Sequence, residues 1–181
     1  MFNPKNLRHL IGFCLLLTPL AASGEDAFSQ LQFLVGNWEA EGKPGEATGH
    51  TEFTMDIQGH ALVRHNHAEY PPAAGKPAYI HDDLMVVYRE VKPVATKGAY
   101  FDAAGYYARY TITSSAPGQA TFVSDVIPGF PRYRVSYSLL PDGRLSTTIE
   151  VSPAGKKEAF GPYLQWTSKR LAAAAPAKAV P

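Results

Sequence analysis

Two histidines that stand two residues apart are the residues of this chain whose type and spacing most directly suggest chemistry. His65 and His67 lie in a segment with the alternation of a β-strand, so both side chains are expected on one face of it. Two imidazoles and a carboxylate from Asp83 or Glu69 would bind a divalent metal such as Zn, Fe or Mn. His67 beside Asp83 would alternatively form a base and its orienting acid, because imidazole titrates near neutral pH. The third interpretation has no ligand: the residues form a hydrogen-bonded polar cluster, or the histidines are simply exposed at the rim of the barrel.

The pairing of the strands decides whether these side chains meet. Symmetric pairing with the next strand, across a loop rich in proline and glycine, sets Glu69 opposite His81 and His67 opposite Asp83. Together with His65, these side chains would gather on one face of the two strands. Pairing with the preceding strand sets Phe53 opposite His65, and this apolar partner predicts that the histidine face points into the interior. A shift of one residue in either pairing would turn every side chain to the other face.

A second group of residues indicates a binding cavity. Tyrosine, tryptophan and methionine side chains on the later strands would line an apolar space, with phenol hydroxyls that orient a ligand, or they would form ordinary core packing. The candidate ligand-binding residues are His65, His67, Glu69, Asp83, Met85, Tyr106, Tyr110, Tyr137 and Trp166. The partner expected for such a cavity is a small apolar or aromatic molecule.

Alternation of apolar and polar residues runs through the middle of the chain and predicts roughly ten strands. The expected strands cover residues 38–42, 51–57, 61–70, 81–91, 99–102, 106–113, 120–127, 132–140, 144–151 and 161–170. Apolar residues at helical spacing predict a short helix over 28–35. No segment between the ends offers the long helix that a parallel sheet needs for its crossovers.

A long antiparallel meander exposes its edge strands unless it closes on itself. We therefore predict an all-β fold, an antiparallel calycin-like barrel of roughly ten strands with a short N-terminal helix. Such a barrel has room for side chains and one small ligand. A flattened sandwich with a filled core is the alternative.

The two ends of the chain are expected to lie outside this fold. A basic start is followed by an apolar run over residues 10–20, which is too short to span a bilayer, and then by small residues, a pattern typical of a signal peptide. The expected organisation is a signal peptide over 1–23, a barrel domain over 24–171 and a disordered tail over 172–181. Cleavage would remove the single cysteine, Cys14, which suits an oxidising compartment. We expect the protein to be exported to the periplasm or the extracellular space.

The composition excludes several classes of protein. The 181 residues are 45% hydrophobic and 18% charged, with 17 Lys and Arg against 16 Asp and Glu. This balance lacks the concentrated positive charge that neutralises phosphates, so no nucleic-acid partner is expected. The apolar residues are too evenly spread for a multi-span protein, and we expect no membrane span in the mature chain. The sequence leaves both a monomer and a homodimer open.

The segment Phe33-Leu34-Val35-Gly36-Asn37-Trp38-Glu39 resembles the start of lipocalin and other calycin barrels, in which a short helix runs into a Gly-x-Trp on the first strand. Residues 64–71 and 81–84 are similar to the same segments of secreted bacterial lipocalin-like proteins. The resemblance covers roughly residues 30–170. It implies a barrel with a cavity and with Trp38 at the closed end.

The resemblance also bears on cofactors. Haem-binding barrels of the nitrobindin type use a histidine near the C-terminus as an iron ligand, but no histidine follows His81, so His-ligated haem is not expected. Fatty-acid-binding barrels hold a carboxylate with Arg-x-Tyr in a late strand. This chain has Arg132-Tyr133-Arg134 there, so fatty-acid binding by that motif is not expected. A divalent metal at His65, His67 and Asp83 stays open.

Together these features favour an exported barrel that binds a small, partly apolar molecule in its cavity. The chain contains no Gly-x-Ser-x-Gly, no His-Glu-x-x-His and no phosphate-binding glycine loop, which favours a binding protein over an enzyme. Two alternatives stay open. One is an enzyme that uses His65, His67 and Asp83, with or without a metal, and the other is an interaction module with a solid interior.

Overall fold

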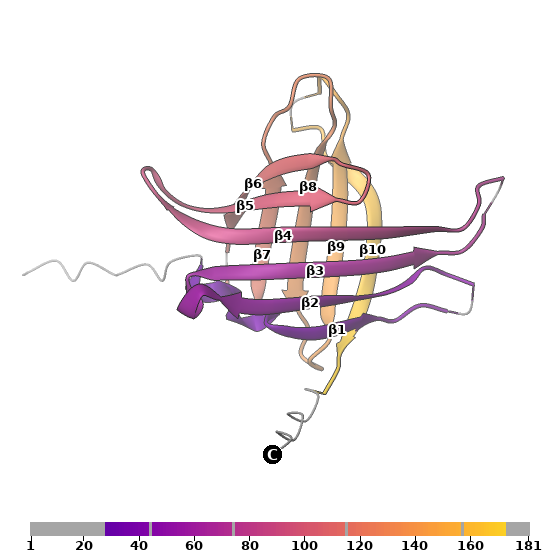
Figure 1. The fold of residues 1–181 in the computed structure, drawn as a ribbon, viewed down its shortest axis with the longest axis horizontal. Helices are drawn as coiled ribbons and strands as arrows, with labels where there is room; N and C mark the ends of the chain where they lie inside the picture. Colours follow the sequence, from indigo (N-terminus) through magenta and orange to yellow (C-terminus); the bar gives the residue numbers. More distant parts are fainter. Residues whose placement is uncertain (1–27, 44, 74, 115, 157, 173–181) are drawn as a thin grey trace, which may run out of the picture.

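The computed structural model describes residues 28–43, 45–73, 75–114, 116–156 and 158–172, and in them the chain forms a closed antiparallel barrel of ten strands (Figure 1). The strands are β1 (Gly36–Ala40), β2 (Thr48–Asp56), β3 (Ala61–Tyr70), β4 (Tyr79–Val91), β5 (Val94–Asp102), β6 (Tyr107–Thr113), β7 (Gln119–Ser124), β8 (Arg132–Leu139), β9 (Leu145–Ser152) and β10 (Gly161–Arg170). Consecutive strands pair with one another, and β1 pairs with β10. The predicted all-β fold and its antiparallel barrel are confirmed.

Alternate residues of most strands face the interior, and a register shift between Pro162 and Leu164 interrupts the alternation in β10. In β6, Ala108, Tyr110 and Ile112 are buried while the residues between them are not, which is the period of two expected for a wall with one solvated face. In Figure 1 the strands β1–β4 run across β7–β10, so the two parts of the wall face each other over the interior. Strands from both parts contribute side chains to one space.

A short 3-10 helix, η1 (Ser29–Leu34), precedes β1 and packs two leucines into the core, where the sequence predicts a helix over 28–35. Leu31, Leu34 and Trp38 are at most 1% exposed. The indole Nε1 of Trp38 donates a hydrogen bond to the carbonyl oxygen of Leu34 at 2.7 Å. Arg170 from β10 lies over the indole ring, with Cζ 4.2 Å from the ring centroid, and donates to the carbonyl oxygen of Phe33 at 2.9 Å. These contacts hold Trp38 in the core beside η1.

The pairing of β2 with β3 differs by one residue from the prediction. Phe53 pairs with Arg64 and not with His65. The cause is the turn between the strands, η2 (Ile57–Gly59), in which Ile57 and Gln58 adopt positive φ angles of 46° and 55°. A β-branched residue rarely adopts this conformation, so the sequence predicted that Ile57 would belong to the strand.

The pairing of β3 with β4 is also shifted by one residue. His67 pairs with Asp82, so the predicted pairing of His67 with Asp83 is wrong. The sequence of the long loop between these strands does not determine how β3 and β4 pair. The register is fixed in the structure by a pair at the loop ends, because Tyr70 pairs with Tyr79 and their rings stack with centroids 4.4 Å apart.

The two shifts turn the histidine strand over. His65, His67 and Glu69 lie on the outer face of β3, where the prediction had them inside. Arg64 and Asn66 take the interior positions. This correction moves the polar site of the barrel from one set of residues to another.

Strand β5 begins five residues earlier than the sequence predicted, directly after the turn at Lys92-Pro93. A close approach of side chains explains the glycine at position 98, in the centre of this strand. A Cβ atom at this position would lie 3.2 Å from Sδ of Met85 and 3.3 Å from Cδ1 of Ile112. Glycine is therefore favoured here by the packing of two interior side chains.

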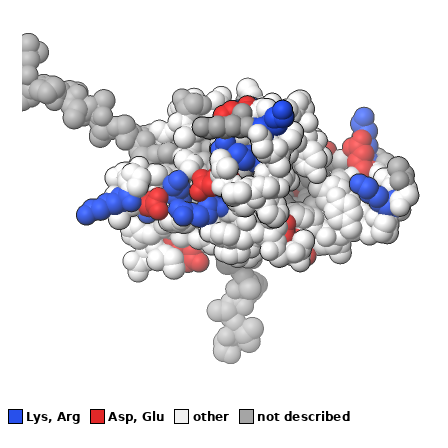
Figure 2. Space-filling view, turned by 90° about the horizontal axis from the view of Figure 1, so that it is seen from above, with Lys and Arg blue, Asp and Glu red and all other residues white. Residues whose placement is uncertain are grey.

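The predicted signal peptide lies outside the described residues, as does the predicted tail from residue 173 onward. Among the described residues, no helix is both long and apolar enough to cross a membrane. On the face shown in Figure 2, lysine and arginine side chains lie beside aspartate and glutamate side chains and do not gather in a basic patch.

Candidate functional site

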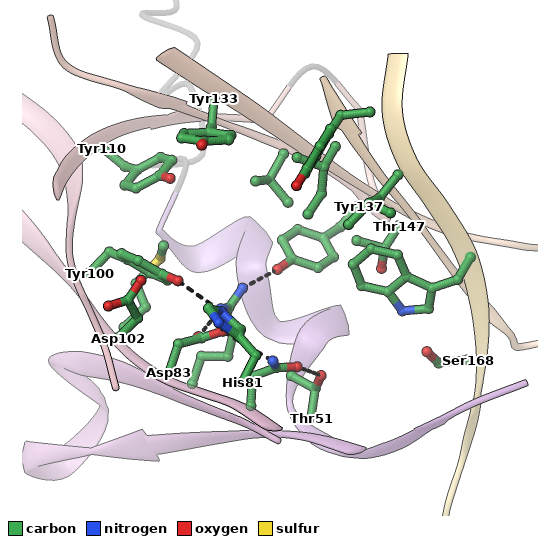
Figure 3. A pocket seen from close by; sticks show the side chains of 18 of the residues that line it. Thr51, His81, Asp83, Tyr100, Asp102, Tyr110, Tyr133, Tyr137, Thr147 and Ser168 are labelled. Carbon is green, nitrogen blue, oxygen red and sulfur yellow. Dashed lines mark hydrogen bonds and ion pairs between the residues drawn. The ribbon is translucent and has the colours of Figure 1, made fainter. Parts of the chain in front are cut away.

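The interior of the barrel contains a cavity of about 370 Å³ (Figure 3). Its lining combines aromatic rings with a group of polar side chains. Of the predicted ligand-binding residues, the structure places six at this cavity: Asp83, Met85, Tyr106, Tyr110, Tyr137 and Trp166. The remaining three, His65, His67 and Glu69, do not line it.

Aromatic rings in edge-to-face contact form much of the cavity wall. The rings of Tyr100 and Tyr110 lie with centroids 6.1 Å apart, and those of Phe53 and Tyr137 lie 5.7 Å apart. Burial raises the pKa of Tyr100 and of Tyr110 above the usual range of a phenol. Their hydroxyls therefore stay protonated, and the wall offers neutral hydrogen-bonding groups on rigid rings.

The cavity reaches the surface at a rim of exposed aromatic side chains. Tyr79, Phe130 and Tyr163 all line the cavity, yet they are 52%, 51% and 59% exposed. Single exposed apolar side chains are ordinary, but a group of them around one opening is typical of a binding site. Their position fits an entrance for an apolar molecule.

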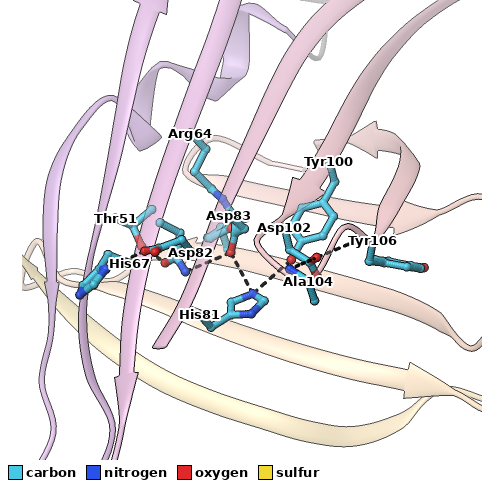
Figure 4. A network of polar contacts seen from close by, with 12 residues as sticks. Thr51, Arg64, His67, His81, Asp82, Asp83, Tyr100, Asp102, Ala104 and Tyr106 are labelled. Atoms are coloured by element: carbon cyan, nitrogen blue, oxygen red, sulfur yellow. Dashed lines mark hydrogen bonds and ion pairs between the residues drawn. The ribbon is translucent and has the colours of Figure 1, made fainter. Parts of the chain in front are cut away.

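One wall of the cavity carries a network centred on Asp83. Arg64 donates to Asp83 through Nη2 and to the hydroxyl of Tyr137 through Nη1 at 2.8 Å. The side-chain amide of Asn66 donates to Oδ2 of Asp83 at 3.0 Å, and Thr51 donates to Oδ1 of Asn66 at 2.7 Å (Figure 4). The network links β2, β3, β4 and β8, so it also ties opposite parts of the wall together.

Charge pairing decides the ionisation of this network. Burial alone raises the pKa of Asp83, but the neighbouring Arg64 and a hydrogen bond from His81 outweigh it and hold the pKa below its usual value. Burial alone lowers the pKa of Arg64, and its interactions with Tyr137 and Asp83 outweigh that effect, so its pKa is raised. Both groups are therefore charged at neutral pH.

His81 extends the network into the cavity. Its Nε2 lies 3.3 Å from Oδ2 of Asp83 and 3.2 Å from the hydroxyl of Tyr100. The hydrogen bond with Asp83 raises the pKa of His81, and partial burial opposes this only in part. The imidazole side chain is 35% exposed, and among the described residues its Nδ1 has no hydrogen-bond partner. His81 is thus a titratable group with one free hydrogen-bonding position at the cavity.

Asp102 is the second carboxylate at the cavity, and it has a structural role. Its Oδ1 accepts hydrogen bonds from the backbone N–H of Ala104 at 3.0 Å and of Tyr106 at 2.8 Å. These bonds hold the turn between β5 and β6. One oxygen of Asp102 is therefore occupied by the backbone.

The predicted metal site is not formed. His67 lies on the outer face, where its Nδ1 is 2.6 Å from Oδ1 of Asp82 and its Nε2 is 3.2 Å from Oε1 of Glu69. The hydrogen bond with Asp82 is the main cause that raises the pKa of His67, and the one with Glu69 adds to it. Together they occupy both ring nitrogens. Asp83 faces the interior, so it cannot join His65 and His67. In the part of the chain that the structure describes, no group of three His, Cys, Asp or Glu side chains is placed to hold a metal ion.

Arg64 and Asn66 are the residues of this wall that the sequence analysis missed, whereas His81 was already grouped with Asp83 by the predicted pairing. A signal for them existed in β2, where Thr51 and Phe53 alternate with strongly polar residues and so identify the interior face. In the observed pairing, these residues stand opposite Asn66 and Arg64. The interior face of β2 was predicted correctly, but the turn after it and the register across the loop between β3 and β4 were misjudged.

The first prediction concerns the pH dependence of stability. Because the folded-state pKa of His81 lies above the ordinary value of 6.5, protonated His81 stabilises the fold below that pH, and the contribution is lost as the pH rises through the folded-state pKa. The difference in free energy of unfolding between wild type and His81→Gln is expected to shrink between about pH 5 and pH 8. Urea denaturation across this range measures it.

Tyr100→Phe is the control, since it removes only the second hydrogen-bond partner of His81. It should leave most of the pH dependence in place because Asp83 is the main cause of the shift. A difference between wild type and His81→Gln that is the same at both ends of the pH range would contradict the assignment.

The chain matches no known protein-family model and no curated protein. Its closed ten-stranded antiparallel barrel is compatible with a calycin-like fold. The function therefore has to be inferred from the cavity and the groups that line it.

Proposed function

We propose that this chain is an exported, lipocalin-like barrel that binds a small, partly apolar molecule in its cavity. The observation that carries the proposal is the cavity of about 370 Å³, lined by aromatic rings and by a polar network on one side. Small-molecule sites are typically concave, mostly apolar and equipped with a few polar groups that set the orientation of the ligand. The cavity has each of these properties.

The division of the lining supports a ligand with two parts. The rings of Tyr110 and Tyr133 offer flat apolar contacts, and His81 lies with its partners Asp83 and Tyr100 on the side of the polar network. A ligand with an aromatic body and one polar group would satisfy both parts. A solid core would have no such space, so the cavity argues against the alternative of a pure interaction module.

The alternative of an enzyme built on His65, His67 and Asp83 loses its support. The two histidines and the carboxylate lie on opposite faces of the wall, and His67 is occupied by two carboxylates. A binding role needs no such cluster. It requires the cavity, an opening and groups that orient the ligand.

Binding of the neutral fluorescent probe N-phenyl-1-naphthylamine tests this proposal. We expect its emission to rise in the presence of the protein, and filling the cavity by Ile149→Trp should weaken binding at least about tenfold, or roughly 1.4 kcal/mol. Ile149 lines the cavity. A fluorescence titration, with circular dichroism to check folding, gives the affinities.

Ile80→Trp is the matched control, because Ile80 is 60% exposed and does not line the cavity. Its affinity for the probe should equal that of the wild type. Equal weakening by both variants, or no binding to the wild type, would contradict the proposal.

Export is tested separately. The apolar segment over residues 10–20 and the small residues after it predict cleavage before Gly24. Expression of the full chain in a Gram-negative host, followed by intact-mass measurement of the periplasmic fraction, should find a chain that begins at or next to Gly24. Recovery of only uncleaved chain in the cytoplasm would contradict export.

A further inference from the structure

We propose that the cavity takes a small aromatic acid whose carboxylate lies against Nδ1 of His81. The inference rests on the proposed binding function and adds the chemical class of the ligand. It depends on how charges and free hydrogen-bonding positions are distributed along the polar wall. Figures 3 and 4 show His81 between Asp83 and Tyr100 at this wall.

Charges alternate along the wall from its buried to its open end. The side chain of Arg64 is only 11% exposed. Its guanidinium pairs with Asp83, whose side chain is 4% exposed. Asp83 in turn pairs with His81, whose side chain is 35% exposed and lines the cavity. The accessible end of the row is therefore a cation when His81 is protonated, and its complement is an anion.

Asp83 has little capacity left for a ligand. It accepts hydrogen bonds from Arg64 and from Asn66, and it pairs with Nε2 of His81. Because Nε2 faces these acceptors, it carries a proton, and Nδ1 becomes a second N–H donor when the imidazole is charged. A carboxylate oxygen at Nδ1 would form a charge-assisted hydrogen bond, which is stronger than one between neutral groups.

The groups around His81 define how the site depends on pH. Asp83 on the same strand and Asp102 on β5 favour its protonated form, whereas Arg64 on β3 disfavours it. Tyr100 contributes a neutral hydroxyl because burial keeps it protonated. His81 is thus the group of this set that changes charge near neutral pH, and binding of an acid should weaken as it loses its proton.

The aromatic part of the ligand follows from the rest of the lining. Tyr106, Tyr110 and Tyr133 line the same cavity as His81. Flat rings pack against such side chains in stacked or edge-to-face geometry. An aliphatic acid would use the carboxylate position without using these ring faces.

The experiment compares two probes of similar shape, 2-naphthoate and 2-ethylnaphthalene, as competitors of N-phenyl-1-naphthylamine. At about pH 6 we expect 2-naphthoate to bind the wild type about tenfold more tightly than 2-ethylnaphthalene. The ratio of the two affinities should fall at about pH 8, where His81 is less protonated while naphthoate remains charged.

His81→Gln should bring the affinity ratio of the two probes close to one and remove its pH dependence. The matched control is His65→Gln, which changes an exposed histidine on the outer face of the same sheet and should keep the wild-type ratio. A ratio near one in the wild type at about pH 6, or a ratio that His81→Gln leaves unchanged, would overturn the inference while the barrel still binds the fluorescent probe. Failure of all three compounds to bind would instead overturn the proposed binding function, and this inference with it.

Discussion

The ion pair between Arg64 and Asp83 is the interaction on which the polar wall of this barrel depends. Removing two charges from water is costly, and the loss is offset only when the charges pair and their other hydrogen-bonding atoms find partners. Tyr137 and Asn66 provide such partners, one for each group, while Nε of Arg64 is buried without a partner among the described residues. With Asp83 held as a carboxylate, His81 is favoured in its protonated form at the cavity. The buried charge of Asp83 thus favours the protonated form of His81, which lies two residues away on the same strand and faces the ligand cavity.

Much of the architecture could be predicted from the sequence, because a half-buried wall imposes a period of two on every strand. The ten strands followed from that period, and the short helix before Trp38 followed from apolar residues at helical spacing. The register did not follow, since it depends on a turn in which Ile57 adopts a positive φ of 46°. One residue at a turn cannot be read from alternation, yet it decides which face of a strand is inside.

The residues of the candidate site were likewise predictable where a strand has one clearly apolar face, and not where the register decides which face is inside. The structure places Tyr110 and Tyr137 at the cavity, and both belong to strands whose apolar face is evident from their neighbours. The strand β3 has polar residues on both faces, with histidines on one and Arg64 and Asn66 on the other, so composition alone could not choose between them. Pairing with β2 makes the choice, and it takes His65 out of the cavity and puts Arg64 into its wall.

The most direct test of this account is a double-mutant cycle on Arg64→Met and Asp83→Asn, measured as free energies of unfolding. If the two side chains form a buried ion pair inside the barrel, each single change leaves an uncompensated buried charge. Each should therefore lower the free energy of unfolding by about 3–5 kcal/mol. The double variant should then cost much less than the sum of the two. Additive effects of a few tenths of a kcal/mol, as expected for side chains in water, would contradict the placement of this pair and the polar wall built on it.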